Sequence, residues 1–152
     1  MRIASIRLVN FRNFRDANVI LASPTLLIGA NEVGKTNLTY ALRLLLDPKL
    51  SESDLEPRES DFHVHAEEDE LTITIHFVDV NEDCVVSKFR HHLSDDGELL
   101  LRYHGRRDPI THRKSYRLFA GRDDASLEEI QSRFYLRVLN LHFIGSRRDL
   151  FA

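Results

Sequence analysis

The 152-residue sequence has a single cysteine, a single methionine and no tryptophan, with four prolines and six glycines. One cysteine, Cys84, excludes an internal disulfide, and this suits a reducing compartment. No apolar run approaches the roughly 20 residues that a membrane-spanning helix needs, and the first residues do not resemble a secretory signal. The sequence therefore predicts a cytoplasmic protein without a membrane partner.

An excess of one charge is also missing. Lys and Arg number 21 and Asp and Glu 24, for a formal net charge of −3. A balance this even excludes a strong overall field for nucleic acids or membranes. With 42% hydrophobic and 30% charged residues, the composition is typical of one globular domain with a packed core.

Because glycines are few, the pair in Gly29–Thr36 is informative. The segment reads Gly-Ala-Asn-Glu-Val-Gly-Lys-Thr and fits G-x-x-x-x-G-K-[ST], the phosphate-binding P-loop. It follows Thr25–Ile28, an apolar run that predicts a buried strand, and it precedes Asn37–Leu46, which has helical spacing. The alternative is a chance glycine-rich turn before a helix, which eight matching residues in this context disfavour.

The motif predicts a site for ATP and Mg²⁺. Glycines let the backbone N–H groups turn toward phosphate, and the helix N-terminus adds its unpaired donors. Lys35 is the expected catalytic residue because its ammonium reaches the β- and γ-phosphates. The Thr36 hydroxyl is the expected Mg²⁺ ligand. The cofactor-binding residues predicted from the motif and its flank are Gly29, Ala30, Asn31, Glu32, Val33, Gly34, Lys35, Thr36 and Asn37.

Most of the remaining chain predicts strands. Alternation of apolar and polar residues predicts half-buried strands at 4–8 and 70–79. Further strands are expected at 18–22, 85–93, 98–104, 116–120 and 138–144. Asp96-Gly97 predicts a hairpin between two of them. A short helix is expected at 125–130, with Ser126 as N-cap and Glu129 completing a capping box. Residues 49–69 read as a long surface loop.

These elements predict an α/β fold of the P-loop NTPase class that carries an antiparallel β-meander subdomain. Residues 1–48 would hold two strands, the P-loop strand and its helix. Residues 70–120 would form the antiparallel region, and 121–152 a short helix and a final strand.

Two segments resemble a known group of ATPases. Ile3–Phe14 contains Asn-Phe-Arg-Asn-Phe, and the loop continues as G-x-N-x-x-G-K-T-N-L. Together they resemble the N-terminus of an ABC-type ATPase head of the RecF, SMC and OLD (overcoming lysogenization defect) group. Asp61-Phe62, and the likeness of Phe143–Leu150 to the Y-I-P-A-x-R-D-L segment, favour the OLD family of ATP-dependent endonucleases.

The resemblance implies an N-terminal lobe of an ABC-type head over residues 1–152, with a second head as partner and DNA as a partner of the complete assembly. It also brings Arg12 and Asn13 toward the nucleotide, although a solvated turn is an equal alternative. The implied role is ATP-gated DNA cleavage in phage defence or DNA processing. Glu32 departs from the family, which often has Gly or Asn there, and a carboxylate near phosphates predicts a modest affinity.

Other family elements are missing from the sequence. Asp79 ends the segment that most resembles a Walker B strand, but Val80 follows it where a catalytic carboxylate is expected, and the strict alternation before it is typical of a strand buried on one face only. No L-S-G-G-Q-like signature or Toprim nuclease segment is found. We therefore expect a chain that binds ATP but is incomplete for hydrolysis, and whether it is an enzyme stays open.

Two rival functions remain. One is a RecF- or SMC-like DNA-repair ATPase head without a nuclease, and the other is a non-catalytic interaction module. Adjacent residues of a strand point to opposite faces, which argues against zinc at His91 and His92, and no cysteine cluster supports zinc at His63 and His65. Arg58 reads as a surface charge. The basic residues of 102–117, with Tyr103 and Tyr116 among them, read as a solvated hairpin end rather than a DNA-binding surface.

Overall fold

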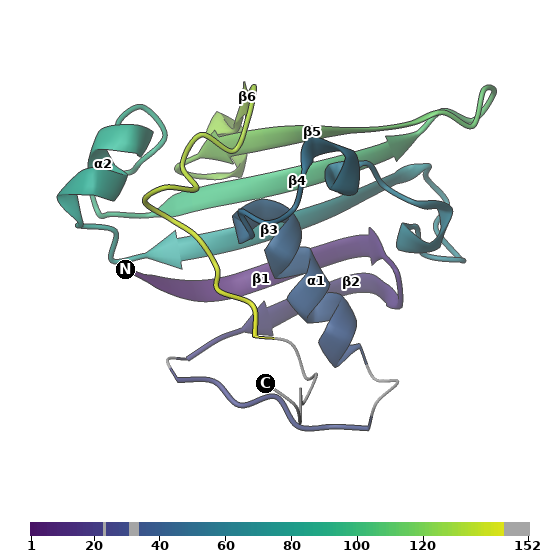
Figure 1. The fold of residues 1–152 in the computed structure, drawn as a ribbon, viewed down its shortest axis with the longest axis horizontal. Coiled ribbons are helices and arrows are strands. Elements are labelled where there is room, and N and C mark those ends of the chain that lie inside the picture. Colours follow the sequence, from purple (N-terminus) through teal and green to yellow (C-terminus); the bar gives the residue numbers. More distant parts are fainter. Residues whose placement is uncertain (23, 31–33, 145–152) are drawn as a thin grey trace, which may run out of the picture.

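The computed structural model describes residues 1–22, 24–30 and 34–144. Within them, six strands form one sheet and two α-helices lie against it (Figure 1). The strands are β1 (Arg2–Phe11), β2 (Phe14–Ile20), β3 (Glu70–Val78), β4 (Leu99–Arg107), β5 (Lys114–Gly121) and β6 (Glu128–Ile130). The helices are α1 (Lys35–Leu46) and α2 (Asp83–Phe89), with short 3-10 turns at Glu52–Leu55, Glu59–Asp61 and Asp124–Ser126. No helix in these ranges has the length and apolar character needed to cross a bilayer.

The sheet has the order β2-β1-β3-β4-β5-β6, and every neighbouring pair is antiparallel. The predicted meander is therefore present, but it continues into β1 and β2 instead of forming a separate subdomain. The register places Ile6 opposite Ile75, Ile75 opposite Leu101, and Leu101 opposite Ala120. All four side chains are fully buried. They therefore form one apolar row that runs across four neighbouring strands.

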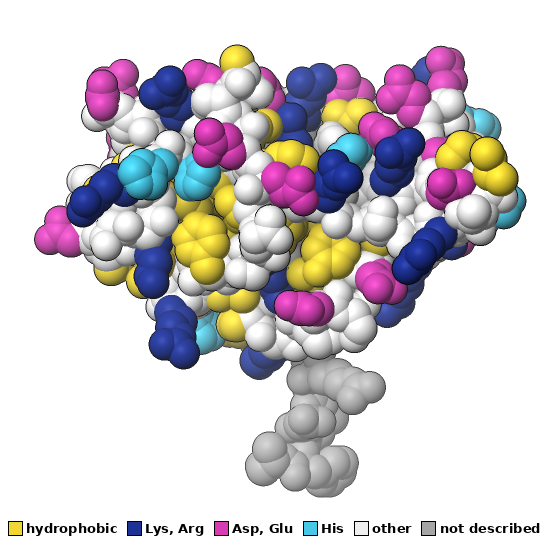
Figure 2. Space-filling model, turned by 90° about the horizontal axis from the view of Figure 1, so that it is seen from above, with side chains coloured by type: hydrophobic (Ala, Val, Ile, Leu, Met, Phe, Trp, Pro, Cys, Tyr) yellow, Lys and Arg dark blue, Asp and Glu magenta, His cyan; other side chains and the backbone are white. Residues whose placement is uncertain are grey.

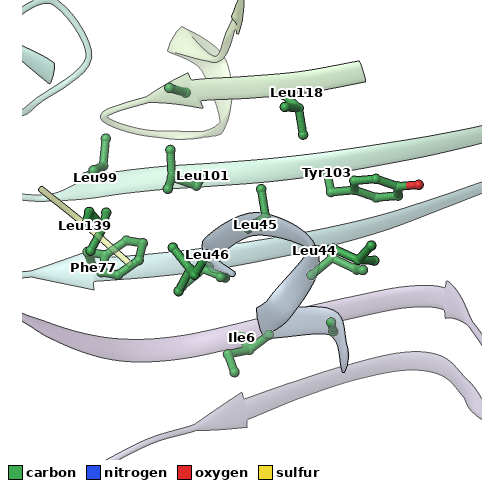
Figure 3. Close-up of a cluster of buried hydrophobic side chains, with 14 of the residues drawn as sticks. Ile6, Leu44, Leu45, Leu46, Phe77, Leu99, Leu101, Tyr103, Leu118 and Leu139 are labelled. Atoms are coloured by element: carbon green, nitrogen blue, oxygen red, sulfur yellow. The ribbon is translucent and has the colours of Figure 1, made fainter. Parts of the chain in front are cut away.

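Helix α1 covers that row. Figure 3 shows Leu44, Leu45 and Leu46 of α1 over Ile6 and Leu101 of the sheet, and all five side chains are buried. Burying a leucine side chain stabilises the fold by about 2 kcal/mol relative to leaving it exposed. The packing of α1 on the sheet thus fixes the position of the residues at the N-terminus of the helix.

The segment after β6 contacts the C-terminal end of α1. The segment and the helix run side by side on one face of the sheet (Figure 1). The Arg133 guanidinium donates to the carbonyls of Asp47 (2.8 Å) and Leu50 (2.6 Å). The Tyr135 hydroxyl donates to the Leu45 carbonyl at 2.8 Å. The Leu45 carbonyl is one of the acceptors that the C-terminal end of a helix leaves without an intrahelical partner, and Asp47 and Leu50 follow the helix.

Several expected elements are wrong. Residues 138–144 are not a strand, because the Leu141 N–H bonds the Leu46 carbonyl at the end of α1 instead of a sheet neighbour. Residues 85–93 begin in α2, where Val85 and Phe89 are four apart and both are buried. The expected helix at 125–130 is a 3-10 turn capped by Asp123, followed by β6. Ser126 is the end of that turn and not its N-cap.

The Asp96-Gly97 turn exists but joins α2 to β4 and makes no hairpin. Gly97 has φ +79°, a conformation that glycine adopts readily. The loop expected at 49–69 contains two of the 3-10 turns, and it buries Leu55 and Phe62.

The strand predicted at Thr25–Ile28 is also wrong. Leu26 is 80% exposed and Ile28 is 85% exposed, and the segment runs beyond β2 at the edge of the sheet (Figure 1). A buried strand needs hydrogen-bonded neighbours on its edges and cover on its faces. No described strand lies beside these residues.

Candidate nucleotide site

The helix α1 begins at Lys35, with Gly34 immediately before it. Gly34 has φ +98° and ψ 6°, a left-handed conformation that costs other residues about 1–2 kcal/mol. A Cβ at this position would lie 2.6 Å from Asn13 Nδ2 and 2.9 Å from Phe14 Cζ. The left-handed backbone therefore favours glycine, and a larger residue would also have to displace the ends of the Asn13 and Phe14 side chains. Of the remaining loop residues, Gly29 and Ala30 are exposed, and Asn31, Glu32 and Val33 lie outside the described residues.

Lys35 and Thr36 occupy the first turn of α1. The Lys35 ammonium donates to the Gly29 carbonyl, which closes the loop on itself. Thr36 is exposed. Both line a pocket of about 340 Å³ with Arg12 and Tyr40, and Arg43 and Phe143 lie at the same pocket. A phosphate oxygen entering here could replace the Gly29 carbonyl as the acceptor of the Lys35 ammonium.

The structure brings Arg12 and Asn13 of the β1–β2 turn to the same helix N-terminus. Arg12 Nη1 donates to Asn37 Oδ1 at 2.8 Å, and Asn37 Nδ2 donates to Asn13 Oδ1 at 2.8 Å. The Arg12 guanidinium also lies 4.2 Å from the centre of the Tyr40 ring, a cation–π contact. The solvated turn that the sequence left open is therefore excluded for Arg12, whose side chain is only 22% exposed.

Asp61 completes this arrangement through a contact that no pattern in the sequence indicates. Its carboxylate accepts from Arg12 Nε at 2.9 Å and from the Arg58 N–H at 2.8 Å. Its carbonyl accepts from the Arg12 N–H at 2.8 Å. Asp61 and Arg12 are 49 residues apart, so neither spacing nor periodicity could have paired them.

The residues present fit a magnesium ion that is bound together with a nucleotide. Mg²⁺ takes oxygen ligands and keeps several waters, so it needs few protein groups. Thr36 offers an exposed hydroxyl directly after the lysine. No group of three or more His, Cys, Asp or Glu suited to a metal is found among the described residues. The ion would therefore be held by Thr36, phosphate oxygens and water.

Asp79, the residue that the sequence argument disfavours as a Walker B carboxylate, does not line the pocket of Lys35 and Thr36. Its carboxylate pairs with Arg2 Nε at 3.2 Å. It lines a different pocket, together with Asp95 and Asp96. Nothing in this arrangement directs Asp79 toward the first turn of α1.

The basic residues of 102–117 are largely neutralised, which supports the reading as a solvated hairpin. Ion pairs join Arg102 to Asp124, Arg106 to Glu70, Arg107 to Asp69 and Glu59, Lys114 to Glu59, and Arg117 to Glu129. The hydrogen bond from Lys114 and the Arg107 charge hold the pKa of Glu59 below its usual value. Figure 2 shows charges of both signs mixed over the face that it presents.

The remaining candidates have structural surroundings of their own. The Arg58 side chain is exposed. His63 Nδ1 accepts from the His65 N–H at 3.1 Å. His91 and His92 follow α2 and are not in a strand, so the strand argument used against zinc there was wrong. No three-ligand group of the kind that a structural zinc ion needs is found in the described ranges.

Comparison with known proteins agrees with this geometry. The AAA ATPase domain family matches residues 1–146. The chain is 34% identical over 85 residues to Endonuclease GajA of Bacillus cereus (strain VD045), which covers 55% of this chain and 14% of that protein. It is 43% identical over 56 residues to the Old nuclease of Escherichia phage P2, and the aligned segment covers 36% of this chain and 10% of that protein. The matched segments are thus a small part of both relatives. The chain belongs to the AAA ATPase domain family and corresponds to the N-terminal part of an OLD-like ATPase.

Proposed function

We propose that the chain is the ATP-binding part of an OLD-like ATP-dependent endonuclease with an ABC-type head. One observation carries the proposal: Gly34, in a left-handed backbone conformation, leads into a helix whose first residues, Lys35 and Thr36, share a pocket with Arg12. The two relatives named above, an endonuclease and a nuclease, support the link to DNA cleavage.

In this site the first N–H groups of α1 and the positive end of its dipole bind the phosphates. The Lys35 ammonium leaves the Gly29 carbonyl for the β- and γ-phosphates, and it stabilises the charge that is transferred when water attacks the γ-phosphate. Thr36 would hold Mg²⁺, which would neutralise phosphate charge when bound. Arg12 lines the same pocket and adds a second cation.

Hydrolysis in this proposal needs groups from outside these residues. Asp79 is paired with Arg2, so a carboxylate that activates water has to come from elsewhere. A second head would cap the γ-phosphate, and the complete assembly would act on DNA in phage defence or DNA processing in the cytoplasm. The chain alone binds ATP and turns it over very slowly or not at all.

Thermal unfolding with and without MgATP tests the binding step. A ligand that binds only the folded state at 100 times its Kd adds about 2.7 kcal/mol, which raises the Tm of a chain of this size by about 5–10 °C. Lys35→Ala should abolish this increase. Thr36→Val should remove the part of it that depends on Mg²⁺. Lys88→Ala, at an exposed position of α2, is the matched control and should behave like wild type.

Two alternatives give different results. A non-catalytic interaction module is favoured by the bond from Lys35 to the Gly29 carbonyl, because the ammonium already has an acceptor. It predicts no rise in Tm with MgATP. A RecF- or SMC-like repair head binds MgATP equally well, but the full-length protein would then leave DNA uncut in the presence of ATP.

A further inference from the structure

We propose that Asp61 is a positioning residue that holds the Arg12 guanidinium in the nucleotide pocket. This inference rests on the proposed function, since it gives Arg12 a nucleotide to meet. It assigns the loop between α1 and β3 a role in the site, although that loop contributes no P-loop residue.

The first step is the strain in the β1–β2 turn. Asn10 has φ +53° and Arg12 has φ +51°, a conformation that non-glycine residues seldom hold without support. The support comes from the 61–63 segment. The Arg12 N–H donates to the Asp61 carbonyl at 2.8 Å, and the His63 N–H donates to the Asn10 carbonyl at 2.9 Å. The turn is thus held from outside its own hairpin.

The second step is the side chain. Asp61 is buried, with 3% of its surface exposed, and a buried carboxylate is stable only when paired and hydrogen-bonded. Both oxygens are used: one accepts from Arg12 Nε and the other from the Arg58 N–H. The Arg12 guanidinium is therefore fixed through its Nε, while its Nη1 donates to Asn37 Oδ1.

The third step is what this fixed guanidinium contacts. Its Nη1 reaches Asn37 in the first turn of α1, and Asn37 bonds Asn13, which packs against Gly34. Arg12 also lines the pocket of Lys35 and Thr36. A continuous set of contacts thus leads from Asp61 to the bend that precedes the lysine. Without Asp61, the long Arg12 side chain could leave the pocket, and binding would have to restore its order.

A double-mutant cycle on the binding of MgATP tests this. Asp61→Asn should weaken MgATP binding about tenfold, which corresponds to the loss of one charge-assisted hydrogen bond. In an Arg12→Gln background the same substitution should change the affinity less than about twofold, because the residue it acts through is gone. A merely structural role predicts an equal loss in both backgrounds and would overturn the proposal.

Asp54→Asn is the matched control, because Asp54 bonds Ser51 in the same loop and forms no hydrogen bond to Arg12. It should leave MgATP affinity unchanged, and an equal loss there would count against a specific role of Asp61. Should Asp61→Asn fail to fold, Arg12→Lys tests the same contact from the other side. Lysine keeps the charge but lacks the separate donors that bridge Asp61 and Asn37. Wild-type affinity in Arg12→Lys would overturn the proposal.

The outcome also separates this inference from the proposed function. If wild type binds MgATP, Lys35→Ala loses it and Asp61→Asn keeps it, only the role of Asp61 is wrong. If wild type binds no MgATP, the proposed function fails and the role of Asp61 fails with it.

Discussion

The Tyr135 hydroxyl donates a 2.8 Å hydrogen bond to the Leu45 carbonyl, 90 residues away in the sequence. Both residues are buried, and burial raises the pKa of Tyr135 above its ordinary value, so the hydroxyl stays a neutral donor. The contact joins the segment after β6 to the last turn of α1. Because the first turn of the same helix carries Lys35, the anchor at one end of α1 steadies the candidate site at the other.

Tyr135→Phe removes that hydroxyl and leaves the Leu45 carbonyl buried without its donor. We expect a loss of about 1–2 kcal/mol in the free energy of unfolding, or about 2–8 °C in Tm. Tyr116→Phe is the control, because Tyr116 is half-buried and its hydroxyl has no hydrogen bond among the described residues. It should change stability by less than about 0.5 kcal/mol. Equal losses in the two variants would contradict the role given to the Tyr135 hydroxyl.

Gly34→Ala places a Cβ against Asn13 and Phe14 in a left-handed backbone. We expect a destabilisation of at least about 1–2 kcal/mol from the backbone conformation alone, together with loss of MgATP binding. Urea unfolding measures the first effect and calorimetric titration the second. A variant with unchanged stability and unchanged MgATP affinity would show that the bend is not required.

Asp47 makes stability depend on pH in the acidic range. Burial opposes ionisation of its carboxyl, but hydrogen bonds from Arg43 and the Lys49 N–H outweigh burial, so the folded pKa lies below its ordinary value of 3.8. Because the pKa of Asp47 is lowered in the folded state, its carboxylate stabilises the fold fully above pH 3.8. This contribution to the free energy of unfolding is lost as the pH falls through the folded pKa.

Asp47→Asn should therefore be less stable than wild type at pH 7, and the gap should narrow as the pH falls below 3.8. Urea unfolding at pH 7, 5, 4 and 3 measures the gap. Asp95→Asn, at an exposed position in the turn before β4, should show no comparable gap. A gap for Asp47→Asn that stays constant down to pH 3 would contradict the role of its charge.

The regular parts of the fold could be predicted from the sequence because their signal is local. Alternation of apolar and polar residues gave β3 within one residue, and the proline after Asp47 gave the end of α1. The P-loop pattern predicted a helix directly after the loop, at Asn37–Leu46, and α1 begins two residues earlier, at Lys35. In each case the residues that decide the structure are neighbours along the chain.

The errors arose where distant contacts decide. Val85 and Val86 favour strand by side-chain type, but Val85 and Phe89 bury one face of a helix. Residues 138–144 are apolar like a strand, yet the Leu141 N–H is used by the Leu46 carbonyl. The pairing of Arg12 with Asp61 is also a contact between residues far apart in the sequence, and no pattern along the chain predicts it.

Direct titration of the chain with MgATP by isothermal calorimetry tests the central claim, that the Gly34 bend and Lys35 bind the phosphates of ATP. We predict saturable binding with one site per chain, lost in Lys35→Ala, which lacks a charged phosphate contact, and unchanged in Lys88→Ala. No heat of binding in wild type, or equal affinity in wild type and Lys35→Ala, would contradict the account.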